Sequence, residues 1–437
     1  MHTIMKAFAG STWSRLRGSR LIHNIASLYG TQIAYLFFPL ATVPYLARVL
    51  GVHQWGLVAF AQAFGVYVGL LVEFGFNLSA TRDVARHRDD RERLSHVLAG
   101  VLGAKVSLAL VSIVIAFALQ HFLRQFRENP YLLWAGVTAG IAQAFNMGWF
   151  YQGLERMRTS AALDVAGKAV GCFGVFLLVH SPAHAARVLA IQAFGSTLAT
   201  SVLLVMAYRE VRFRWPSTIG TLDALRTGGS MFLFRSAVSL YTTMNTLMVG
   251  ILAGPVAVGC FAGAEKLCRA AVALQQPLSQ SLYPKLSFLH DRNKERAASV
   301  AWIGTSLLLG LGAISSVILF LAAGLLVHLL LGPKYVAAVP IVRILAFLPI
   351  GVSLACAIAY QWMLPLRLDR QMTISALLGG VWCLLVGLIL YPFLGPSGVA
   401  VGTVTSEFVV AAYYIVALRA YWRRSAGAPA ENPVSVV

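Results

Sequence analysis

The 437-residue sequence has little charge for its length. Charged residues make up 12%, hydrophobic residues make up 58%, and the mean hydropathy is +0.73. A soluble domain carries about twice that charge fraction. Apolar runs of about 20 residues recur along the chain, the length that crosses a hydrocarbon core of about 30 Å. We therefore predict an all-α, polytopic membrane protein and exclude a set of two or three soluble domains.

The sequence also lacks the residue patterns of common catalytic and metal centres. Its five cysteines lie inside apolar runs without metal-ligand spacing, and there is no Cys/His cluster, no DxD-like motif and no catalytic triad. The longest predicted loops have about 20 residues, too few for an extramembrane active site. We therefore expect no enzyme, no metal and no cofactor, and keep a membrane-embedded glycosyltransferase or polymerase as an alternative.

The apolar runs predict twelve transmembrane helices, arranged as two lobes of six. The expected spans are 25–47, 55–76, 97–120, 131–153, 161–180, 184–207, 228–252, 256–282, 299–330, 338–363, 373–393 and 397–421. The corresponding division is an N-tail at 1–24, an N-lobe at 25–207, a linker at 208–227, a C-lobe at 228–421 and a C-tail at 422–437. An even number of spans places both termini on one side of the membrane.

Basic residues alternate between the two sides of this predicted topology. The chain has 35 Lys and Arg against 16 Asp and Glu, a net charge of +19. The side with the termini collects 24 basic residues and the opposite side collects five. The positive-inside rule then predicts cytoplasmic termini, and it accounts for the net charge without a nucleic-acid partner.

An internal repeat supports the division into lobes. Residues 51–61 and 254–264 both fit the pattern G-x4-G-x2-A-x-A, at an offset of 203 residues. Each copy links the first and second spans of a predicted six-span half. Two parallel halves around a central cavity are an arrangement found in transporters.

Ten charged residues fall inside the predicted spans, where each costs about 2.5–3.5 kcal/mol on insertion scales. The basic ones are Lys105, Lys168, Arg235, Lys266, Arg269 and Arg343, and the acids are Glu73, Asp164, Glu265 and Glu407. One interpretation is structural pairing. Asp164 and Lys168 stand at i,i+4, as do Glu265 and Arg269, and Arg235 could pair with an acid such as Glu73 across the lobes.

The other interpretation is a water-filled cationic cavity that attracts an anion. Polar residues share helical faces with several of these charges, since spacings of three and four residues return to one side of a helix. The candidates for the polar lining are Gln62, Glu73, Ser239, Thr242, Asn245, Glu265, Gln276 and Glu407. Arg and Lys both suit a phosphate ligand, Arg through its planar fork and Lys as a point charge.

Several motifs resemble those of Wzx-type oligosaccharide flippases, members of the multidrug/oligosaccharidyl-lipid/polysaccharide exporter superfamily. The main one is WFYQGLERM at 149–157. The others are YLARVLG at 45–51 with Gly56, the pair Phe234 and Arg235 leading to Asn245 and Gly259, and LGPKY at 331–335 leading to Pro340 and RIL at 343–345. The resemblance extends over about residues 20–424, with one departure, Pro255, in the turn between the seventh and eighth spans.

This resemblance implies two six-helix lobes that form a V around a cationic cavity. The substrate-binding residues it implicates are Arg48, Arg235, Lys266 and Arg269, to which the charges inside spans add Lys105 and Lys168. The implied function is movement of a polyprenyl-diphosphate-linked oligosaccharide repeat unit, such as an O-antigen or lipopolysaccharide unit, to the outer leaflet by alternating access.

The implied location is the bacterial inner membrane, with the lipid bilayer, the lipid-linked oligosaccharide and other polysaccharide-assembly membrane proteins as partners. A cation-coupled drug exporter of the same fold is the nearest alternative. The sequence does not identify a coupling ion, for which proton and sodium are both open.

Overall fold

The computed structural model describes residues 20–427, apart from 280–285, 287–288, 290–293 and 367. Within these residues the regular elements are helices and there is no strand. The all-α membrane architecture predicted from the hydropathy is therefore confirmed. Eight helices in the described part are long and apolar enough to span a bilayer. Each of the twelve predicted spans lies largely on helix, but twelve separate crossings remain a prediction.

The N-terminal half contains several broken or kinked helices. Its elements are α2 (Arg20–Glu73), α3 (Phe76–Arg86), α4 (Arg91–Phe122), α5 (Arg124–Glu128), α6 (Pro130–Ala144), α7 (Gly148–Gly153), α8 (Met157–Leu178), η1 (Pro182–His184) and α9 (Ala185–Glu210). The first two predicted spans form the single element α2, which is kinked at Gly51.

The C-terminal half is also interrupted, and it includes two short π-helices, η2 and η4. Its elements are α10 (Thr218–Thr242), α11 (Met244–Ala253), α12 (Pro255–Ala273), α14 (Lys294–Leu321), α15 (Ala323–Leu326), η2 (Val327–Leu331), η3 (Pro333–Tyr335), α16 (Ala338–Leu345), α17 (Leu348–Ile358), η4 (Ala359–Met363), α18 (Asp369–Leu394) and α19 (Pro396–Gly427).

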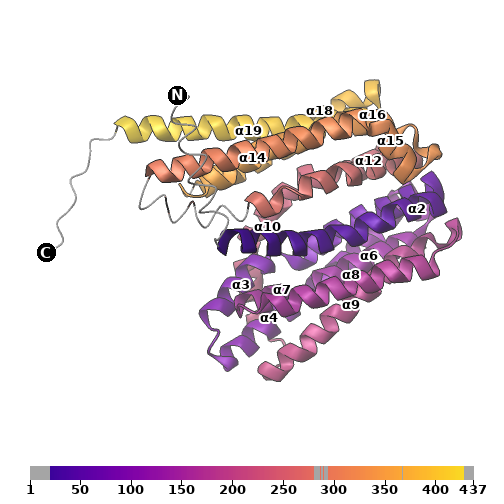
Figure 1. The fold of residues 1–437 in the computed structure, drawn as a ribbon. Coiled ribbons are helices and arrows are strands. Elements are labelled where there is room, and N and C mark those ends of the chain that lie inside the picture. The colour runs from indigo at the N-terminus through magenta and orange to yellow at the C-terminus, as the bar shows by residue number, and fades with distance from the viewer. Residues whose placement is uncertain (1–19, 280–285, 287–288, 290–293, 367, 428–437) are drawn as a thin grey trace.

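The helices form two groups that together make a V (Figure 1). The group from α2 to α9 and the group from α12 to α19 converge where α15 and α16 lie. They diverge toward the end where α2 begins and α19 ends. The main contact between the groups is between α2 and α12. We call the converging end the closed end.

The two copies of the internal repeat have the same backbone geometry at the closed end. Gly51 has φ 71° and ψ 171°, and Gly254, its counterpart in the second copy, has φ 79° and ψ −178°. This left-handed region is open to glycine because glycine has no Cβ. Pro255 then occupies the first position of α12, where its fixed φ fits a helix start and its missing N–H costs nothing.

The second glycine of each repeat lets the two copies cross in close contact. A Cβ added at Gly56 would lie 1.8 Å from the carbonyl oxygen of Pro255 and 2.9 Å from the nitrogen of Gly259. A Cβ at Gly259 would lie 2.3 Å from the carbonyl oxygen of Val52. The repeat therefore forms the crossing between α2 and α12.

Side chains add hydrogen bonds between the halves at this end. The Arg48 guanidinium donates to the carbonyl oxygen of Leu329 in η2. The buried hydroxyl of Tyr335 donates to the carbonyl oxygen of Ala47 over 3.0 Å. Both bonds join α2 to the C-terminal half, so the halves are held together there.

The predicted linker at 208–227 contains the end of one helix and the start of the next. Helix α9 continues to Glu210, α10 begins at Thr218, and the non-helical part is 211–217. Ser217 starts α10 because its hydroxyl accepts a hydrogen bond from the Gly220 nitrogen over 3.1 Å. The first turns of α10 then pack on α4, where a Cβ at Gly100 would lie 2.7 Å from the Gly220 carbonyl oxygen.

Candidate functional site

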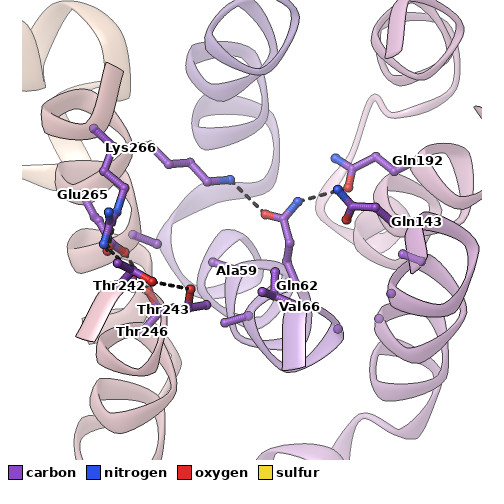
Figure 2. Close-up of a pocket in the computed structure, with 17 residues that line it drawn as sticks. Ala59, Gln62, Val66, Gln143, Gln192, Thr242, Thr243, Thr246, Glu265 and Lys266 are labelled. Carbon is purple, nitrogen blue, oxygen red and sulfur yellow. Dashed lines mark hydrogen bonds and ion pairs between the residues drawn. The ribbon is translucent and has the colours of Figure 1, made fainter. Parts of the chain in front are cut away.

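A cavity of about 370 Å³ lies between the two halves, beside the crossing of α2 and α12. It is lined by residues of both halves (Figure 2). These are Ala59, Gln62, Ala63, Gly65, Val66, Gly136, Ala139, Gly140, Gln143, Gln192, Thr242, Thr243, Thr246, Ala262, Glu265, Lys266 and Arg269. We call it the central cavity.

A second cavity of about 940 Å³ continues from it, away from the closed end. The two share Val66, Gln143, Thr242 and Thr243 in their linings. The second cavity reaches Glu73, which follows the kink at Gly51 by 22 residues and therefore lies roughly 33 Å farther along the helix. The polar space thus extends from the centre of the V toward its open end, and we call this part the entry cavity.

Lys266 projects into the central cavity and binds neutral groups. Its ammonium donates to the Gln62 side-chain oxygen over 3.0 Å and lies 4.5 Å from the centre of the Trp55 ring. The Gln62 amide nitrogen donates in turn to the Gln192 side-chain oxygen over 3.1 Å, a chain visible in Figure 2. Since both of these Lys266 partners are neutral, its positive charge can serve an incoming anion.

Arg269 lines the same cavity but is paired. Its guanidinium lies 2.8 Å from the Glu265 carboxylate and also donates to the Thr242 carbonyl oxygen. The second Glu265 oxygen accepts a hydrogen bond from the Thr246 hydroxyl over 2.9 Å. The ion pair that the spacing of Glu265 and Arg269 predicts is therefore present.

Arg235 and Glu73 form an ion pair across the entry cavity. The guanidinium lies 3.4 Å from Glu73 Oε1, with the side chains 40% and 14% exposed. That buried oxygen accepts no hydrogen bond among the described residues, so the attraction is through charge alone. The structure therefore contains the pairing across the lobes that the sequence offered as the alternative to a phosphate site at Arg235.

The remaining predicted cation of the entry cavity is Lys168. It lies 2.5 Å from Asp164, its i,i+4 partner on α8. The second Asp164 oxygen accepts a hydrogen bond from the Asn146 amide over 3.3 Å. Both charged side chains line the entry cavity.

Two other predicted binding residues lie outside these cavities. Lys105 is 0% exposed, and its ammonium donates over 2.7 Å to the Ala144 carbonyl oxygen at the end of α6. The break between α6 and α7 leaves such carbonyls without helical partners, and Lys105 satisfies them. Arg48 lies at the closed end, bound to Leu329.

Of the residues predicted to form the polar lining, some line the cavities and others lie outside them. Five of the eight candidates line the cavities, namely Gln62, Glu73, Ser239, Thr242 and Glu265. Asn245 is fully buried and accepts a hydrogen bond from the Cys383 thiol over 3.2 Å, while Gln276 and Glu407 line neither cavity.

Sequence reasoning missed two residues of the site. Gln192 carries a signal that could have found it, because Gln192, Ser196 and Thr200 form a polar stripe at i, i+4 and i+8. Trp55 lies inside the repeat, yet nothing in its spacing marks a role beside Lys266.

The fold is one that solved membrane transporters share. The chain is similar in fold to an inward-facing multidrug MATE transporter, with a TM-score of 0.72, 15% identity and coverage of 91% of this chain and 96% of the other. It is similar also to the lipid II flippase MurJ in an inward closed conformation, with a TM-score of 0.69, 12% identity and coverage of 91% and 87%.

Residues 21–290 match the family model described as "Polysaccharide biosynthesis protein", and the chain belongs to this family. A relative from Escherichia coli strain K12, provisionally named an O-antigen transporter, is 26% identical over 91% of this chain and 97% of its own length. A relative of the same name from Shigella dysenteriae is 25% identical over 91% and 99%. The names of both relatives agree with the expectation of a transporter rather than an enzyme.

Proposed function

We propose that this protein moves a polyprenyl-diphosphate-linked oligosaccharide repeat unit from the cytoplasmic to the outer leaflet of the bacterial inner membrane. The observation that carries the proposal is Lys266, a cation with neutral partners in the central cavity between the lobes. A diphosphate is the anionic group of such a substrate, and a low-dielectric cavity strengthens its attraction to an ammonium.

The neighbouring ion pairs suit the same ligand. Arg269 lines the central cavity and Arg235 lines the entry cavity, each with a carboxylate beside it. In our proposal the diphosphate takes the place of the carboxylates Glu265 and Glu73, and each guanidinium then offers its fork of donors. Lys168 offers a further contact in the entry cavity.

The polar space also suits the sugar. A repeat unit exposes many hydroxyls, and each costs about 4–8 kcal/mol to bring unpaired from water into hydrocarbon. A wet cavity removes most of that barrier, and the lipid tail can remain in the bilayer between the lobes. The present V, open toward the predicted cytoplasmic end, is then the loading state of an alternating-access cycle.

The cationic surplus argues against the drug-exporter alternative. The four basic side chains Lys168, Arg235, Lys266 and Arg269 face the three acids Glu73, Asp164 and Glu265 in the central and entry cavities. Each acid stands beside a base, whereas an exporter of cationic drugs benefits from an acid that is available to its cargo.

The test is a strain that lacks this protein. We expect lipid-linked repeat units to accumulate on the inner leaflet and the surface polysaccharide to be lost. A copy of the gene should restore the polysaccharide, and an inserted but inactive Lys266→Met copy should not. Normal surface polysaccharide together with hypersensitivity to drugs would contradict the proposal and favour the exporter.

A further inference from the structure

A third cavity of about 230 Å³ opens from the central cavity into the N-terminal half. It lies among α2, α6, α8 and α9, and it shares Gln62, Gln143, Gln192 and Lys266 with the central cavity. We call it the side pocket. Because Lys266 lines both cavities, an anion bound to its ammonium would stand at the mouth of the side pocket.

The side pocket contains hydrogen-bonding groups that the rest of the described chain leaves unused. The indole N–H of Trp55 is buried, its side chain being 1% exposed, and it has no hydrogen-bond acceptor among the described residues. Such a buried donor destabilises the fold if nothing binds it. Gln192 accepts from Gln62 through its oxygen, which leaves the two hydrogens of its amide nitrogen for another partner.

Hydrogen-bond acceptors also line the pocket. The Asp164 carboxylate, the Asn146 amide and the Ser196 hydroxyl line the pocket and bring acceptors as well as donors. The apolar walls are supplied by side chains such as Val58 and Leu46. A few converging polar groups on a largely apolar wall are the usual chemistry of a small-molecule site.

We propose that the side pocket binds the sugar residue attached directly to the diphosphate. This inference rests on the proposed function, since it requires the diphosphate at Lys266. A pyranose ring carries hydroxyls that both donate and accept, so it matches the Gln192 amide, the Ser196 hydroxyl and the Asp164 carboxylate that line the pocket. The volume of about 230 Å³ has room for a single sugar.

A glycine on the pocket wall allows the pocket to be filled selectively. A Cβ at Gly171 would meet one atom within 4 Å, the Cα of Gln192 at 3.9 Å, which is an ordinary van der Waals distance. Gly171→Ala should therefore be tolerated, whereas Gly171→Leu places three more carbon atoms in the pocket. Ser196→Leu fills the same space from α9.

The experiment measures the affinity of the purified full-length protein in lipid nanodiscs for two kinds of probe. Farnesyl diphosphate offers the lipid and the diphosphate without a sugar. The second kind is the same lipid diphosphate carrying one N-acetylglucosamine, one glucose or one galactose. We expect at least one sugar probe to bind about tenfold tighter than farnesyl diphosphate, the equivalent of one or two hydrogen bonds.

Gly171→Leu and Ser196→Leu should remove this gain while farnesyl diphosphate still binds as it does to the parent protein, which also shows that the variants are folded. Gly171→Ala should keep the gain. If no sugar probe binds tighter, or if the gain survives both leucine variants, the side pocket is not the sugar site. If farnesyl diphosphate binds equally well to the parent and to Lys266→Met, the assignment of the diphosphate to Lys266 fails instead. Because farnesyl diphosphate carries no sugar, this result can be told apart from a failure of the side pocket.

Discussion

The carboxylate of Glu73 lies 3.4 Å from the guanidinium of Arg235, and this ion pair joins the end of α2 to α10. It crosses between the two halves toward the open end of the V. A second contact nearby joins the same two helices, since the Tyr67 hydroxyl on α2 donates to the Ser239 carbonyl oxygen on α10 over 3.1 Å. The pair can therefore act in binding the diphosphate, in holding the halves together, or in both.

A double substitution separates these roles. We expect Arg235→Ala to reduce substrate affinity by about 10- to 100-fold, the loss of one charge-assisted contact of about 1.5–3 kcal/mol. If Arg235 binds the diphosphate, then Arg235→Ala combined with Glu73→Ala should remain inactive in export although it inserts normally. Recovery of surface polysaccharide in the double variant would mean that the single variant is inactive only because Glu73 is left unpaired. Arg235 would then have a structural role. Arg235→Lys should retain part of the activity, because the charge survives and the fork does not.

Lys266 should be the most sensitive position in the central cavity. We expect Lys266→Met to abolish export and to weaken farnesyl diphosphate binding by tenfold or more, as expected for a charge-assisted contact of about 1.5–3 kcal/mol. Its matched control is Lys105→Met, which removes a buried ammonium that lines neither cavity and binds backbone carbonyl oxygens. That control should lower the thermal stability of the purified protein and leave the affinity of the folded fraction unchanged. Equal affinity losses in both variants would contradict the separation of their roles.

The crossing of the repeats predicts a conformational effect of a single methyl group. Gly56→Ala would place a Cβ 1.8 Å from the Pro255 carbonyl oxygen, so the closed end cannot keep its present packing. We expect the halves to separate there. A cysteine at Thr243, which lines the central cavity, should then react with an impermeant maleimide added outside the cell.

The control for this methyl is Gly310→Ala, since a Cβ at Gly310 meets nothing within 4 Å. It should leave the labelling of the Thr243→Cys protein unchanged. The labelling of the parent protein, which carries only the native cysteines, gives the background. Labelling that Gly56→Ala does not raise would show that the crossing tolerates the methyl and does not control access.

The predicted orientation can be tested in intact cells. Single cysteines at Asp89 and Ser217, both exposed, should resist an impermeant maleimide because their loops are predicted to be cytoplasmic. A cysteine at the exposed Lys334, in η3 at the closed end, should be labelled. The loop at 284–297, between the eighth and ninth predicted spans, is also predicted to be cytoplasmic and falls mostly outside the described residues. Labelling at Ser217 from outside would overturn the assignment of six spans to each half.

The sequence predicted much of the architecture because a bilayer constrains a chain along one dimension. Each helix must satisfy its own backbone groups within the hydrocarbon, so hydropathy alone marks where the helices lie. The repeat at 51–61 and 254–264 likewise marked the crossing, since glycines at equal spacing allow equal turns and equal close approach. Pairs four residues apart, such as Glu265 and Arg269, were predictable because helix geometry fixes their separation.

What the sequence by itself determined is therefore the membrane class, the helical segments, the repeat and the local ion pairs. Only the tertiary structure decided which charges face the cavities. Lys105 and Lys266 are both lysines within apolar spans, yet one binds the carbonyls of a broken helix and the other binds Gln62 and Trp55. The Gln62 and Lys266 side chains meet although 204 positions separate them. The cost of burying a charge can be estimated at each position of the sequence. The group that compensates the charge depends on how distant helices pack, and no local sequence pattern encodes that packing.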